Sequence, residues 1–82
     1  MNSERIDVVL PDLGDVEQVR VVQWLHHPGE ALHAGDDLLE VETEKTTFVV
    51  PAPVSGRLVE IIAAEGTTIE RGALLGRIER TG

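Results

Sequence analysis

The chain contains no cysteine, which excludes disulfides, thiolate metal sites and a cysteine nucleophile. No window reaches the ~20 apolar residues that a membrane-spanning helix needs. At the N-terminus, Glu4 and Arg5 stand where a secretory signal peptide would need its apolar stretch. We therefore predict a cytoplasmic protein that has no membrane partner.

Lysine is almost absent too. The formal net charge is −8, and Lys45 is the only lysine beside six arginines. A field of this sign repels phosphate backbones, so we predict no nucleic-acid partner, and it attracts basic surfaces of other proteins. A GC-rich genome that favours arginine codons would explain the single lysine. A need for one target of an amine-modifying enzyme would explain it as well, and the two explanations are compatible.

The length of the chain disfavours large-pocket enzymes. We predict one domain over residues 1–82, with a core from about 6 to 79, because so short a chain buries only about 60–65% of its unfolded surface. An enzyme needs a nucleophile or a paired acid and base in a cleft, whereas the acidic residues here fit turns or exposed strand faces. We therefore predict a monomeric, non-catalytic domain.

The composition indicates short strands rather than helices. Val, Ile and Thr are abundant, turn-forming glycines and prolines recur, and apolar residues tend to alternate. An all-β protein follows from this pattern. The predicted strands are Ile6–Leu10, Val19–Leu25, Asp37–Thr43, Thr46–Val50, Gly56–Ala63 and Leu74–Glu79, with short bridging strands at Ala31–Leu32 and Thr68–Ile69.

An internal repeat relates the two halves of the chain when the segment from Val21 is placed over the segment from Leu58. Neither half could bury its apolar face alone, so we predict a flattened barrel or sandwich of two antiparallel sheets with pseudo-twofold symmetry. The matching glycines are predicted turn residues and not a phosphate-binding loop. The pairs at one offset are Gly29 with Gly66, Gly35 with Gly72, Leu32 with Ile69, Leu38 with Leu75 and Val41 with Ile78.

The segment between the halves is predicted to be a hairpin whose tip is Glu44 and Lys45. A shift by one residue would mix apolar and acidic residues on both faces, so the pattern fixes the register. A Glu-Lys tip departs from the usual Asn-Gly, as sequences often do at functional sites; a different turn or a longer loop would also explain it. The register pairs Thr43 with Thr46, Val41 with Phe48 and Leu39 with Val50, and it leaves Leu38 and Val49 on the opposite face.

A lysine at a turn tip is suited to carry a covalently attached group. An enzyme that acylates the ε-amine needs an uncrowded nucleophile on a protruding support, and amide formation removes the lysine charge. The lysine stem and an acyl chain would form a tether that raises the local concentration of the carried group. Solvated lysines at turns are also common, so the pattern alone leaves both interpretations open.

The three histidines and the single tryptophan have simpler interpretations. Adjacent strand side chains such as His26 and His27 point to opposite faces, and no carboxylate spacing completes a metal motif with His33. We predict surface turn residues and no metal site. Trp24 is predicted to pack, half buried, against the sheet, and the alternative is that it lies at the edge of a partner surface.

Three segments carry a resemblance to a known family: LPDLG, PGEALHAGDDLLEVETEKTTFVVPAPVSGRL and GTTIERGALLGRIE. From about Ile6 to Glu79 the chain resembles the lipoyl domains of 2-oxo acid dehydrogenase complexes, which have the biotinyl/lipoyl fold. In that family the modified lysine lies in a Glu-Thr-Asp-Lys-Ala-like motif, and the resemblance implies that its neighbours help to recognise the site. The matching residues here are Glu42, Thr43, Glu44, Lys45 and Thr46, of which Glu44 and Thr46 depart from the motif.

The resemblance implies that Lys45 carries lipoate as a covalent cofactor. A lipoate-protein ligase or lipoyl transferase would load it, and the arm would serve a thiamine-diphosphate 2-oxo acid decarboxylase, a dihydrolipoamide acyltransferase and a dihydrolipoyl dehydrogenase. The chain would be a free-standing carrier or part of a larger acyltransferase. The alternatives are a biotin carboxyl carrier, which typically flanks its lysine with methionines, an unmodified interaction module, and a relative of the glycine-cleavage H protein.

Overall fold

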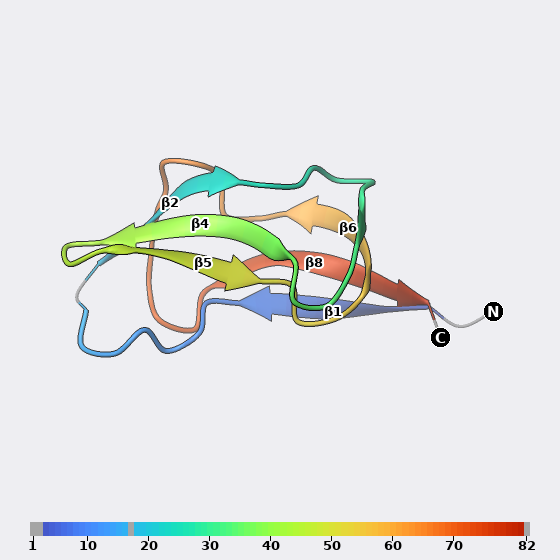
Figure 1. Ribbon diagram of the computed structural model, residues 1–82, viewed down its shortest axis with the longest axis horizontal. Helices are drawn as coiled ribbons and strands as arrows, with labels where there is room; N and C mark the ends of the chain where they lie inside the picture. The colour runs from blue at the N-terminus through green and yellow to red at the C-terminus, as the bar shows by residue number, and fades with distance from the viewer. Residues whose placement is uncertain (1–2, 17, 82) are drawn as a thin grey trace.

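The computed structural model describes residues 3–16 and 18–81, and every regular element in this part of the chain is a β-strand. Over the same residues no helix could cross a membrane. The strands form two antiparallel sheets, ordered β1-β8-β6-β3 and β5-β4-β2-β7, which confirms the predicted all-β sandwich (Figure 1). Their bounds are β1 (Ser3–Val9), β2 (Val19–Trp24), β3 (Ala31–Leu32), β4 (Asp37–Thr43), β5 (Thr47–Pro51), β6 (Gly56–Ile61), β7 (Thr68–Ile69) and β8 (Leu74–Thr81).

Strand boundaries match the prediction for β3, β4 and β7 and differ for the other five. β1 begins earlier and β8 ends later because they pair with each other as far as Ser3 and Thr81. β5 is shifted by one residue because the Thr46 carbonyl closes the preceding turn. β2 and β6 end sooner than predicted, although Leu25 and Ile62 each donate one further backbone hydrogen bond.

The two halves are related as the repeat predicts, since β2, β3 and β4 correspond to β6, β7 and β8. Their turns interlock: the Gly29 N–H donates to the Leu58 carbonyl and the Gly66 N–H to the Val21 carbonyl, both at 2.7 Å. Gly29 and Gly66 have φ of 99° and 86°, a region that favours glycine. Each turn is therefore completed by a strand of the other half.

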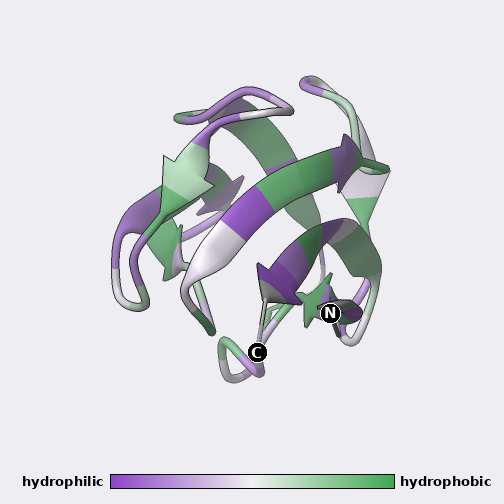
Figure 2. Cartoon of the chain, turned by 90° about the vertical axis from the view of Figure 1, so that its right-hand side faces the viewer, coloured by the Kyte–Doolittle hydropathy of each residue, from purple (hydrophilic) through white to green (hydrophobic). Residues whose placement is uncertain are grey.

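The core lies between the two sheets, and viewed along the long axis the strands surround it (Figure 2). The sequence prediction was wrong for Leu38. Simple alternation puts this residue on the face opposite Leu39, whereas both side chains are 0% exposed. The β4–β5 ladder shifts register between Asp37 and Leu39, and such a bulge turns two consecutive side chains inward. Leu75, the equivalent of Leu38, is also fully buried.

Trp24 fastens the end of β2 to the other half of the molecule. Its indole Nε1–H donates to the Ala63 carbonyl at 2.7 Å, and its backbone N–H donates to a Glu65 carboxylate oxygen at 3.0 Å. The ring lies against Gly76, where an added Cβ would stand 3.1 Å from it. The predicted packing role is confirmed, with the side chain buried rather than half buried.

The bulge in β4 can be tested with a matched pair of substitutions. Leu38→Ala should lower the free energy of unfolding by about 2–5 kcal/mol because it empties a core site. Leu25→Ala, at a side chain that is 41% exposed, should cost about 1 kcal/mol or less. Urea denaturation of both variants measures the difference, and equal losses would mean that Leu38 faces solvent.

Candidate attachment site

Lys45 lies at the tip of the β4–β5 hairpin, at the end of the molecule opposite the pairing of Ser3 with Thr81 (Figure 1). The side chain is exposed. The predicted register is confirmed, because Leu39 pairs with Val50 and Val41 with Phe48. The apolar pattern of the hairpin therefore determines which residue protrudes.

The Thr43 hydroxyl organises the turn. Its Oγ1 accepts hydrogen bonds from the backbone N–H groups of Lys45 and Thr46, both at 3.1 Å, and donates to the Thr46 carbonyl at 3.1 Å. The Thr43 N–H donates to the same carbonyl at 2.8 Å. No described residue other than glycine has positive φ, so this turn is not of the Asn-Gly kind. A threonine side chain supplies the local closure instead.

The other motif residues differ in how far they are exposed. Glu42 is half-buried and forms an ion pair with Arg20, its partner across the β2–β4 ladder, whereas Glu44 and Thr46 are exposed beside Lys45. The five motif residues thus form one end of the molecule. A shallow, open groove of about 400 Å³ lies beside them, lined by Gln18, Arg20, Glu42, Thr43, Glu44 and Thr68.

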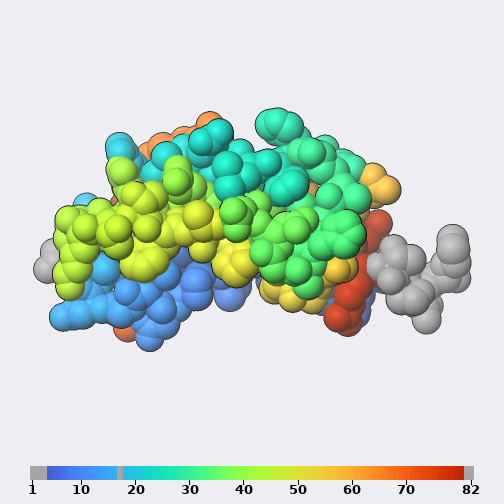
Figure 3. Space-filling model, viewed as in Figure 1, coloured from blue at the N-terminus to red at the C-terminus, as the bar shows by residue number. Residues whose placement is uncertain are grey.

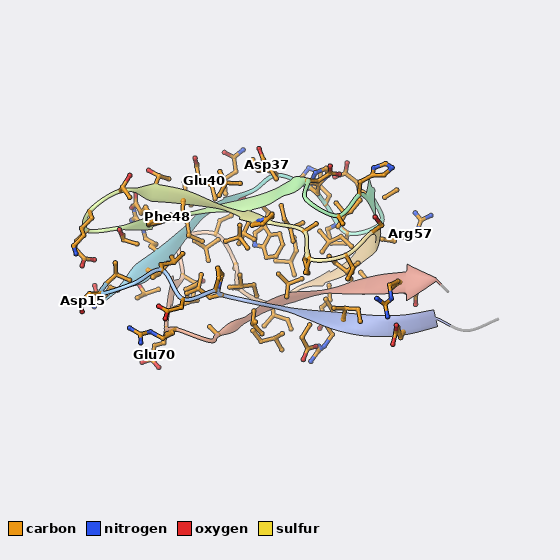
Figure 4. The ribbon with its side chains drawn as sticks, turned by 60° about the horizontal axis from the view of Figure 1, so that its bottom comes forward. Asp15, Asp37, Glu40, Phe48, Arg57 and Glu70 are labelled. Carbon is orange, nitrogen blue, oxygen red and sulfur yellow. The ribbon has the colours of Figure 1, made fainter. Side chains whose placement is uncertain are left out.

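The β1–β2 loop is the part of the site that sequence reasoning missed. The Lys45 ammonium Nζ donates to the Asp15 backbone carbonyl at 3.3 Å, and the loop and hairpin tip share one end of the molecule (Figures 3 and 4). The LPDLG segment was part of the family resemblance, but nothing in the sequence placed it beside Lys45. Asp15, which follows this segment directly, lies thirty positions before Lys45 in the sequence.

Charge is divided unevenly between the two sheets. β1, β6 and β8 carry four acidic and four basic residues, which cancel, so the net charge of −8 comes from the rest of the chain. Arg77 joins these strands, with Nε 3.2 Å from Asp7 and Nη1 2.7 Å from Glu60; the hydrogen bond to Glu60 raises the pKa of its guanidinium. The sheet that contains β4 has three acidic residues, Asp37, Glu40 and Glu42, and one basic residue, Arg20, so it is the more acidic of the two sheets.

The histidines lie away from the hairpin tip. His26 Nδ1 is 3.8 Å from a Glu30 carboxylate and His33 Nδ1 is 3.9 Å from an Asp36 carboxylate. His27 and His33 are exposed as predicted, whereas His26 is half-buried. Among the residues described, no three potential ligands gather into a group that could hold a metal ion.

Two related β-halves, joined through a hairpin with an exposed lysine at its tip, define a class of small attachment domains. The chain belongs to the Biotin_lipoyl family, whose model, described as "Biotin-requiring enzyme", matches residues 6–78. This match covers nearly all of the predicted core and confirms the resemblance drawn from the sequence.

The chain is also similar to parts of larger proteins. It is 46% identical over 74 residues to the dihydrolipoyllysine-residue succinyltransferase component of the 2-oxoglutarate dehydrogenase complex of Bartonella vinsonii subsp. berkhoffii, covering 89% of this chain and 18% of that protein. It is 41% identical over 73 residues to the dihydrolipoyllysine-residue acetyltransferase component of the pyruvate dehydrogenase complex of Corynebacterium glutamicum, covering 88% and 11%. The chain thus spans less than a fifth of these relatives.

A solved structure shares the fold over nearly the whole chain. The lipoyl domain of the 2-oxoglutarate dehydrogenase complex from Azotobacter vinelandii, determined by NMR, has a TM-score of 0.76 and 32% sequence identity. The match covers 94% of this chain and 99% of that domain. The two-sheet architecture described above is therefore that of a lipoyl domain.

The Thr43 turn predicts a difference between two substitutions. Thr43→Val removes the hydroxyl but keeps the branched shape, and should cost about 1 kcal/mol of unfolding free energy and speed hydrogen exchange at the Thr46 amide. Thr43→Ser keeps the hydroxyl and should leave that exchange near its original rate. Amide exchange measured by NMR checks both, and unchanged exchange in Thr43→Val would show that the hydroxyl does not hold the turn.

Proposed function

We propose that this chain is a lipoyl carrier domain in which lipoate is joined by an amide bond to Lys45. The observation that carries the proposal is the position of the only lysine, exposed at the tip of a hairpin in a domain that shares its fold with a lipoyl domain. The site fits the group, because an accessible amine on a protruding support is what an acylating enzyme requires.

When bound, lipoate would supply the redox-active disulfide that the cysteine-free chain lacks. The chain's own residues have a mechanical role. Thr43 sets the turn that projects Lys45, and the Arg20–Glu42 ion pair ties the end of β4 next to the turn to β2. We propose that Glu42, Thr43, Glu44 and Thr46 form the surface by which partners recognise the site. The domain itself performs no bond-breaking step.

The proposed partners follow from the relatives, which are acyltransferase components of 2-oxo acid dehydrogenase complexes. A lipoate-protein ligase or lipoyl transferase would load Lys45. The arm would then serve a thiamine-diphosphate 2-oxo acid decarboxylase, a dihydrolipoamide acyltransferase and a dihydrolipoyl dehydrogenase. As a further part of the proposal, the domain acts as a monomer in the cytoplasm, alone or within a larger acyltransferase.

Intact mass spectrometry with peptide mapping tests the attachment. The protein expressed with lipoate and biotin supplied should gain a lipoyl group on Lys45, and Lys45→Arg, which keeps the charge, should gain nothing while unfolding at the same urea concentration. A biotinyl group would identify a carboxylase carrier instead. An unmodified mass, in a host whose own lipoyl domains are fully modified, would favour a bare interaction module and contradict the proposal.

The uneven charge predicts a second difference, in the rate at which the decarboxylase acylates the loaded domain. Asp37 and Glu40 project from the outer side of β4 (Figure 4), and the variant Asp37→Asn/Glu40→Gln should slow the reaction at low salt by about twofold to fivefold. The control Glu4→Gln/Glu79→Gln makes the same charge change on the neutral sheet and should have a smaller effect. Equal rates for both variants would show that the acidic residues of β4 do not steer the domain to the decarboxylase.

A further inference from the structure

The β1–β2 loop offers Lys45 a fixed hydrogen-bond acceptor. The Asp15 carbonyl lies 3.3 Å from Nζ, and the lysine ammonium has three protons to donate. Amide formation removes the positive charge but leaves one N–H on the same nitrogen. The modified side chain therefore retains the donor that this contact requires.

Hydrogen bonds within the loop and packing against the core hold its backbone in place. The Gly14 N–H donates to the Asp12 carboxylate at 2.9 Å, and the Val16 N–H donates to the Gly14 carbonyl at 3.0 Å. Leu13 and Val16 are partly buried against the core. These contacts fix the backbone on both sides of Asp15, so its carbonyl has a defined direction.

Arg71 clamps the same loop from the turn between β7 and β8. Its Nη2 donates to the Gly14 carbonyl at 3.3 Å, and its Nε lies 4.0 Å from the Asp12 carboxylate. Both contacts fall within three residues of Asp15. The polar contacts of Arg71 are to Gly14 and Asp12 and that of Lys45 is to Asp15, so Arg71 would act on the lysine through the loop.

We propose that residues 12–16 of the β1–β2 loop form a docking site for the acylated arm, in which the Asp15 carbonyl accepts the ε-amide N–H of Lys45 and Arg71 is the positioning residue that holds this segment. The attachment end of the arm is then oriented, while the bonds beyond the amide remain free to rotate. This inference rests on the proposed function for its biological role. The contact itself requires only an acylated Lys45.

The single lysine makes the contact directly measurable. The domain is labelled with [ε-¹⁵N]lysine and acetylated with an N-hydroxysuccinimide ester: the N–C bond forms, the ester C–O bond breaks, and N-hydroxysuccinimide leaves as the amine loses a proton. One side-chain amide signal results, because the other group acetylated, the N-terminal amine, carries no label. Hydrogen exchange at this amide should be slower than in free Nε-acetyl-lysine by about twofold to tenfold, the range for one net hydrogen bond.

A matched pair of variants tests the clamp. Arg71→Met should return the ε-amide exchange to the free rate, whereas Arg80→Met, which removes an exposed ion pair with Glu4 at the other end of the molecule, should leave it slow. Exchange at the free rate in the original sequence would overturn the docking site. Slow exchange in a folded Arg71→Met variant would overturn the role of Arg71.

The outcome separates this inference from the proposed function. If cells attach lipoate to Lys45 but its ε-amide exchanges at the free rate, the carrier function stands and the docking site is wrong. If the chemically acetylated amide is protected but cells never modify Lys45, the docking contact stands and the carrier function is wrong.

Discussion

Backbone hydrogen bonds join the two halves of this molecule, and through them each half completes a turn of the other. The turn at Gly29 is closed by β6 of the second half, and the turn at Gly66 is closed by β2 of the first, at the same distance of 2.7 Å. Because a single half would leave both its turn and its apolar face incomplete, the halves form one shared core. Leu38 and Leu75, equivalent residues that are both fully buried, occupy matching places in it.

The symmetry also explains where the functional hairpin lies. The chain must connect one half to the other, and it does so through β4, the Lys45 turn and β5, at one end of the long axis (Figure 1). The equivalent position at the opposite end is where β8 pairs with β1. The paired strands β4 and β5 support this tip, so Lys45 protrudes from the end of the molecule beside the open groove.

The fold was largely predictable because its signals are local or periodic. Alternation gave the register of Val41 with Phe48, and the offset of 37 residues gave the symmetry. The bulge at Leu38 was not predictable, since it breaks the alternation on which strand assignment depends. The contacts of Asp15 with Lys45 and of Gly14 with Arg71 join segments far apart in sequence, and only the folded arrangement of the two sheets brings them together.

The central claim is that the hairpin specifies one projecting position, and exchanging two neighbours tests it most directly. The variant Glu44→Lys/Lys45→Glu keeps the composition and the charge but moves the lysine by one residue. The extent of lipoylation in cells, measured by intact mass, should fall sharply while the urea midpoint stays close to that of the original sequence. Full modification at position 44 would contradict the claim, because any exposed lysine on the turn would then suffice.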